Sequence, residues 1–180
     1  MTHVFLDTNI FFSEGLRSLL LHLFEWNGSY YPHWSDHVLG EWRATHRNKS
    51  GNSKVKNADI LTKNQKELWP EAYLKVQDKT SESTLWDQAD SKIAQSAIQG
   101  NCEWIVTYNI KDFPNSKLRK FGLRPIHPEK MLLDFLEKEE TMALIQSFVQ
   151  ARFNGKMELF LTYLKKIALN KVATAIERRL

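Results

Sequence analysis

The sequence of 180 residues has one cysteine, Cys102, so no disulfide bond can form within the chain. A lone cysteine fits a reducing compartment and argues against a metal site built from cysteines. The sequence has no run of about 18 or more apolar residues, so we expect no membrane-spanning helix. The N-terminus also lacks a basic stretch followed by an apolar one, the pattern of a secretory signal. These absences predict a cytoplasmic protein with no membrane partner.

The composition is that of a soluble globular protein, with 42% hydrophobic and 26% charged residues. The formal net charge of +4 is a weak indication of a polyanionic partner by itself. The basic charge is concentrated in residues 43–56, which contain no acidic residue. This basic segment could bind phosphates, or it could be only a solvated loop. Its basic residues are Arg43, Arg47, Lys49, Lys54 and Lys56.

Apolar periodicity predicts strands that alternate with helices along the first 140 residues. Ser13 is a plausible start and Gly28 a plausible end for the first long helix, and Pro128 is typical of a first helical position. The polar stretch 48–57 is expected to be a loop. We expect strands at 3–8, 29–34, 72–77, 103–109 and 123–127, and helices at 13–28, 36–47, 57–68, from Asp87 or Asp90 to Gly100, and at 128–140.

This alternation predicts an α/β fold with a central, mostly parallel sheet and helices on both faces, in three α/β/α layers. The chain from about Thr141 is helical by pattern, with one apolar stripe at 144–149 and a second at 161–172. We interpret residues 1–140 as the main domain and residues 141–180 as a helical extension packed onto it.

Acidic residues stand where the predicted strands end. Asp7 ends the first strand, Asp112 follows the strand at 103–109, and Asp90 lies near the start of the preceding helix. Ligands of open parallel sheets bind at the carboxyl ends of the strands, so these carboxylates could converge there. Crowded carboxylates repel one another, and a hard divalent cation such as Mg²⁺ or Mn²⁺ relieves that repulsion. Asn9 would then orient the acids.

Each acid also has an ordinary structural explanation. An aspartate after a strand often caps a helix or makes a turn, and that could account for Asp7, Asp90 or Asp112. Asp87, one turn before Asp90, is an equally good cap. Glu41, alone on a predicted helix, would more often be solvated. No single residue decides between these explanations, so the order of the motifs carries the argument.

That order resembles the PIN-domain family of metal-dependent ribonucleases, in particular the VapC-like toxins of toxin–antitoxin pairs. "VFLDTNIFFSEGL" is similar to the family's first strand with its leading acid, and "SDHVLGEW" is similar to its second motif. "DQADSKIAQSAIQGNCEWIVTYNIKDFP" is the most specific part, because it combines an acid, a helix, a strand and a second acid before Phe-Pro. "LRPIHPEKMLLDFL" and the helical tail resemble the C-terminal part of one toxin-like branch.

The resemblance implies an endoribonuclease that hydrolyses RNA phosphodiester bonds with Mg²⁺ or Mn²⁺. It implies that four acids hold the metal, that three polar residues position ligands or the phosphate, and that the basic segment binds RNA. It further implies a cognate protein antitoxin, and homodimers are common in the family. The implied metal ligands are Asp7, Glu41, Asp90 and Asp112, and the implied supporting residues are Asn9, Thr107 and Asn109.

Two other functions remain to be weighed. Haloacid-dehalogenase-like phosphatases also use a strand-end aspartate, but they need a second aspartate two residues later, where this chain has Asn9. A PIN-like module that binds RNA or protein without cleaving it is the stronger alternative. Whether Asp87 shares the role of Asp90 also stays open at this stage.

Overall fold

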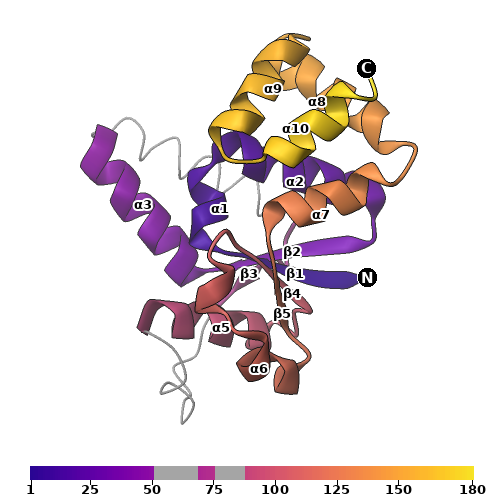
Figure 1. Cartoon of the computed structure of the whole chain (residues 1–180). Helices are drawn as coiled ribbons and strands as arrows, with labels where there is room; N and C mark the ends of the chain where they lie inside the picture. Colours follow the sequence, from indigo (N-terminus) through magenta and orange to yellow (C-terminus); the bar gives the residue numbers. More distant parts are fainter. Residues whose placement is uncertain (51–68, 76–87) are drawn as a thin grey trace.

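Five parallel strands form the sheet in the computed structural model, which describes residues 1–50, 69–75 and 88–180 (Figure 1). The strand order is β3-β2-β1-β4-β5, so β1 is central and Val4 pairs with both Pro32 and Trp104. This arrangement confirms the predicted α/β architecture with a parallel sheet. The strands are β1 (Thr2–Leu6), β2 (Tyr30–Ser35), β3 (Tyr73–Leu74), β4 (Trp104–Val106) and β5 (Arg124–Ile126).

Helices cover both faces of the sheet. Helices α2 and α7 lie on one face, α5 and α6 lie on the other, and α8, α9 and α10 stack outside α2 and α7 (Figure 1). The longer helices are α2 (Glu14–Asn27), α3 (Asp36–Ser50), α5 (Gln88–Gln99), α7 (Pro128–Leu136), α8 (Thr141–Phe153), α9 (Met157–Lys166) and α10 (Asn170–Glu177). The short ones are α1 (Thr8–Phe12), α6 (Asn115–Leu118) and the 3₁₀ turns η1 (Ile110–Asp112) and η2 (Arg119–Phe121).

The core begins at the central strand, where Val4, Phe5 and Leu6 are fully buried. Three consecutive buried residues are expected of a parallel strand covered on both faces. Helix α2 presents a buried leucine stripe to the sheet and ends at Gly28, whose φ of 63° allows the left-handed C-cap. The end of this helix at Gly28 was therefore predicted correctly.

Several predicted boundaries are wrong by a few residues. Strand β1 ends at Leu6, because Asp7 already caps α1. Helix α3 continues to Ser50, three residues into the predicted loop, and α7 stops at Leu136. In the predicted strand 72–77 only Tyr73–Leu74 is a strand, and residues 76–77 lie outside the described part of the chain. The whole of the predicted helix at 57–68 also lies outside it.

The second C-terminal stripe is not one helix. Ala168 has a φ of 62° and separates α9 from α10. The Leu169 N–H bonds to the Leu164 carbonyl and the Ala168 N–H to that of Lys165, which is a Schellman turn. Leu164 and Leu169 are both fully buried, and apolar residues are frequent at these two positions of a Schellman turn. The sequence hides the break because glycine usually occupies the position of Ala168.

Candidate functional site

Asp7 stands at the junction between β1 and α1, with its side chain only 7% exposed. Its carboxylate accepts three hydrogen bonds, each 2.6 Å long. One oxygen accepts from the Thr8 backbone N–H, and the other accepts from the Asn9 Nδ2 and the Thr107 hydroxyl. Asp7, Thr8 and Asn9 are three polar residues between the apolar residues 4–6 and 10–12. Their hydrogen bonds hold the Asp7 carboxylate in one orientation.

The end of β4 supplies the other half of this arrangement. Thr107 directly follows β4 and is fully buried, and its hydroxyl also accepts the Asn109 backbone N–H at 2.9 Å. The Tyr108 backbone N–H donates to Asn9 Oδ1 at 3.4 Å. Because β1 and β4 are neighbours in the sheet, residues about a hundred positions apart meet at their carboxyl ends.

Glu41 reaches the same place from α3. Its Oε2 accepts the Thr8 hydroxyl at 2.6 Å, so Thr8 contacts Asp7 through its backbone and Glu41 through its side chain. His37, one turn earlier on α3, lies 3.4 Å from the other Glu41 oxygen. Sequence reasoning proposed for Thr8 only that it holds the turn, and it assigned no role to His37. For His37 the available signal was its spacing of four residues from Glu41 on one helix face.

Burial raises the pKa of the Asp7 carboxyl to about 6, and the negative charges of Asp90 and Glu41 add to this effect. The hydrogen bonds from Thr107 and Thr8 oppose it, because they favour the charged form. Asp90 lies in the first turn of α5, which the chain places beside α3. The structure thus brings Asp7, Glu41 and Asp90 within electrostatic reach of one another.

Asp112 is different, because it is exposed in η1 and is not among the groups that shift the pKa of Asp7. Asn109, just before η1, is also exposed. Within residues 1–50, 69–75 and 88–180, no three His, Cys, Asp or Glu side chains are gathered closely enough to hold a metal ion. The donor chemistry nevertheless fits a hard divalent cation, since positive charge stabilises a buried carboxylate that neighbouring acids repel.

The predicted RNA-binding residues are only partly described. Arg43 is half-buried on α3. Arg47 and Lys49 belong to the same helix, but their side chains lie outside the described part of the chain. Lys54 and Lys56 also lie outside the described residues, as does Asp87.

None of the helices in the described ranges is both long and apolar enough to cross a membrane. No solved structure matches the chain. A curated relative is named "Putative ribonuclease VapC50" and comes from Mycobacterium tuberculosis. It is 36% identical to this chain over 64 residues. That alignment covers 34% of this chain and 38% of the relative, so it spans well under half of either protein. The family model described as PIN domain matches residues 3–111, which include every residue of the Asp7 hydrogen-bond network, and the chain therefore belongs to the PIN-domain family.

Proposed function

We propose that the chain is a divalent-metal-dependent endoribonuclease, a hydrolase of RNA phosphodiester bonds that acts as the toxin of a type II toxin–antitoxin pair. The observation that carries the proposal is the buried Asp7 carboxylate, held by three hydrogen bonds and placed under the negative charge of Asp90 and Glu41. A purely structural cap gains nothing from two further acids nearby. Membership of the PIN-domain family and the name of the partial relative support the same activity.

Asp7, Glu41, Asp90 and Asp112 would hold one or two Mg²⁺ or Mn²⁺ ions. When bound, such an ion stabilises negative charge on the attacked phosphate and lowers the pKa of a water. Asn9 and Thr107 act as positioning residues, because their donors are directed at Asp7. Thr8 couples the positions of Asp7 and Glu41, and Asn109 would contact the scissile phosphate.

The basic segment would bind the phosphates that flank the cleaved bond. Such contacts give salt-dependent affinity and little sequence information. The four acids would also attract a basic side chain of a cognate antitoxin, which would block the site. A homodimer and a cytoplasmic location remain part of the proposal.

The experiment is a cleavage assay on purified full-length chain with RNA, Mg²⁺ or Mn²⁺, and then a chelator. Cleavage that requires the metal and disappears with the chelator supports the proposal. Metal-independent RNA binding without cleavage would instead identify a non-catalytic PIN-like module. A phosphatase would release inorganic phosphate from small phosphoesters and leave RNA intact.

The assay also decides which aspartate near the start of α5 serves the reaction. Asp90→Asn should remove most cleavage, because the Asp90 charge acts on Asp7. Asp87→Asn should retain much of it. Asp134→Asn on α7 serves as a control, because it removes only the surface ion pair between Asp134 and Lys130. The opposite ranking of the first two variants would transfer the metal-binding role to Asp87.

A further inference from the structure

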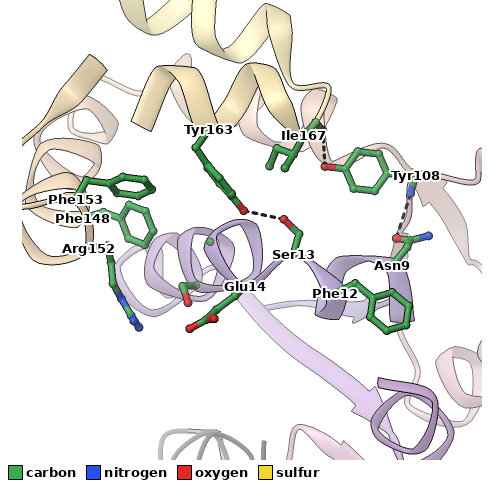
Figure 2. A pocket seen from close by; sticks show the side chains of 12 residues that line it. Asn9, Phe12, Ser13, Glu14, Tyr108, Phe148, Arg152, Phe153, Tyr163 and Ile167 are labelled. Carbon is green, nitrogen blue, oxygen red and sulfur yellow. Dashed lines mark hydrogen bonds between the residues drawn. The ribbon is translucent and has the colours of Figure 1, made fainter. Parts of the chain in front are cut away.

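A cavity of about 690 Å³ opens beside the acid site (Figure 2). It lies between the start of α1 and α2 on one side and helices α8 and α9 on the other. Asn9 and Tyr108 line it, and both belong to the hydrogen-bond network of Asp7. A molecule bound at the carboxylates could therefore extend directly into this cavity, which we call the aromatic pocket.

The walls of the aromatic pocket are aromatic rings held in fixed positions. The Tyr163 hydroxyl accepts the Leu16 backbone N–H at 2.8 Å and contacts the Ser13 hydroxyl at 2.7 Å. The Tyr108 hydroxyl donates to the Ile167 carbonyl at 3.1 Å. Phe153 packs against Tyr163 with ring centroids 5.8 Å apart. Such rigid rings lose little conformational freedom when a flat ligand stacks on them.

Among the aromatic residues of this lining, Phe12 is the exposed one. Its side chain is 44% exposed although its neighbours Ile10 and Phe11 are buried. Figure 2 shows Phe12 at the end of the pocket nearest Asn9 and Tyr108, with Phe148, Phe153 and Arg152 at the other end. Because Asn9 shares this end of the pocket and donates to Asp7, the apolar face of Phe12 is available to a ligand that reaches the acid site.

Two charged side chains complete the lining, Glu14 and Arg152. Both are exposed, and within the described part of the chain neither takes part in an ion pair or a hydrogen bond through its side chain. Arg152 supplies hydrogen-bond donors and Glu14 supplies acceptors. A nucleobase edge pairs with these two kinds of group, whereas an apolar peptide segment uses neither.

We propose that the aromatic pocket takes one unstacked nucleobase of the RNA strand, next to the phosphate held at the acid site. This inference rests on the proposed function, because it takes RNA as the substrate. Single-stranded RNA is commonly recognised by stacking of bases on aromatic side chains and by hydrogen bonds to their edges. Phe12 and Tyr108 provide the stacking surface at the end nearest the acid site. Glu14 and Arg152, toward the other end, provide hydrogen-bonding groups for the next nucleotide of the strand.

The test measures binding of the full chain to short labelled single-stranded RNAs, with a chelator present so that no cleavage consumes them. In one series of RNAs, an abasic nucleotide replaces each position in turn. Loss of the base that enters the pocket should weaken binding by about tenfold, the size of one base–aromatic stacking contact. Phe12→Ala should weaken binding of the intact RNA by about tenfold and leave binding of that abasic RNA unchanged. Arg152→Gln should alter the preference among the four bases at the next position of the strand.

Two variants serve as matched controls. Trp26→Ala removes an exposed aromatic side chain at the far end of α2, and Arg178→Gln removes an exposed arginine beyond α10. Both should bind intact and abasic RNAs with the same ratio as the unchanged chain. Equal binding of all the abasic RNAs, or unchanged RNA binding by Phe12→Ala, would overturn the nucleobase pocket. Loss of binding to a partner protein in Phe12→Ala, with RNA binding intact, would assign the pocket to that protein instead.

The binding readout separates this inference from the proposed function. Base-dependent RNA binding without metal-dependent cleavage would leave the pocket standing and refute the nuclease. Metal-dependent cleavage without any base-dependent binding would leave the nuclease standing and refute the pocket.

Discussion

Burial of the Asp7 side chain disfavours its charged carboxylate form, and the hydrogen bonds from Thr107 and Thr8 favour that form. Its pKa of about 6 is the net result, so the carboxylate is charged at neutral pH even though it is buried. In the unfolded chain the same group titrates near 3.8. Between these two values the folded state binds more protons than the unfolded state, so stability falls as the pH rises from about 4 to about 6. Without a cation, Asp7 therefore lowers the stability of the folded protein at neutral pH.

Asp7→Asn tests this directly. The substitution removes the buried charge, and a pKa rise from 3.8 to about 6 corresponds to about 3 kcal/mol at ~1.4 kcal/mol per pKa unit. It also places an amide NH₂ where one donor already points, which costs about 1 kcal/mol. In thermal melts without divalent metal, the variant should be as stable as the original chain or more stable at pH 7.5. That advantage should disappear near pH 4.

The same variant should lose most RNA cleavage and much of its affinity for Mn²⁺. A structural cap would give the reverse pattern, since its loss costs ~1 kcal/mol of stability and leaves the chemistry intact. If Asp7→Asn is destabilised at pH 7.5 yet still cleaves RNA, Asp7 serves the fold alone.

At the scale of elements, helix α9 completes the start of α2. Ser13 is the N-cap residue of α2 but makes no side-chain capping bond to it. The Tyr163 hydroxyl instead accepts the Leu16 N–H, one of the unpaired donors of the first turn. Gly15 allows this approach, because a Cβ atom there would lie 2.6 Å from the Tyr163 ring. The C-terminal extension thereby fixes the turn at Ser13 between α1 and α2. This turn comes one short helix after Asp7.

Gly15→Ala should therefore destabilise the protein, even though alanine is the better helix former by about 1 kcal/mol. The added methyl group displaces the ring and with it the cap. Gly40→Ala on α3 is the matched control, because nothing lies within 4 Å of the added Cβ, and it should leave stability unchanged or raise it. Chemical denaturation of both variants measures the difference. If Gly15→Ala is as stable as Gly40→Ala, the Tyr163 ring can move away without loss of stability, and its bond to Leu16 does not stabilise α2.

The extent to which the sequence predicts these elements depends on whether the signal is local. Gly28 and Pro128 mark helix ends by their own backbone preferences, and both were predicted correctly. The break at Ala168 was missed, because its left-handed conformation is stabilised by the burial of Leu164 and Leu169. At the site, the order of motifs identified the acids as candidates. The Thr8–Glu41 and Tyr163–Leu16 bonds could not be predicted, since they join residues whose proximity only the fold decides.

At the scale of the whole molecule, the net charge of +4 is unevenly distributed, and the basic segment is the part expected to meet RNA. Neutralising Arg47, Lys49, Lys54 and Lys56 together should weaken RNA binding and flatten its salt dependence. Each lost phosphate contact should reduce the slope of log K against log salt by about 0.7 for a single strand. Metal affinity should be unchanged.

A charge-matched control replaces four exposed basic residues of the C-terminal region, which lie outside this segment. A similar loss of slope in the control would mean that only the total charge matters, and an unchanged slope in both would make the segment a solvated loop. The control positions are Lys156, Lys166, Lys171 and Arg178.

The core is continuous from the sheet into the C-terminal extension. Phe24 of α2 packs on Phe135 of α7, and His22 of α2 packs on Phe148 of α8. The buried apolar residues of α8, α9 and α10 belong to the same hydrophobic cluster as Val4. The predicted boundary at 140/141 therefore divides the sequence at a point where packing continues across it.

A chain that ends at Glu140 should consequently fail to fold. Removal of the extension exposes the outer side of α2 and α7, and each large apolar side chain that returns to water costs about 1.5–3 kcal/mol. A few such side chains equal the net stability of a typical domain, about 5–15 kcal/mol. Near-ultraviolet circular dichroism and a thermal melt should show neither fixed aromatic packing nor a cooperative transition. A chain shortened only by the exposed Leu180 should melt like the original. A cooperative melt of residues 1–140 would instead make the nuclease region an independent folding unit, with α8–α10 as a dispensable cover of the aromatic pocket.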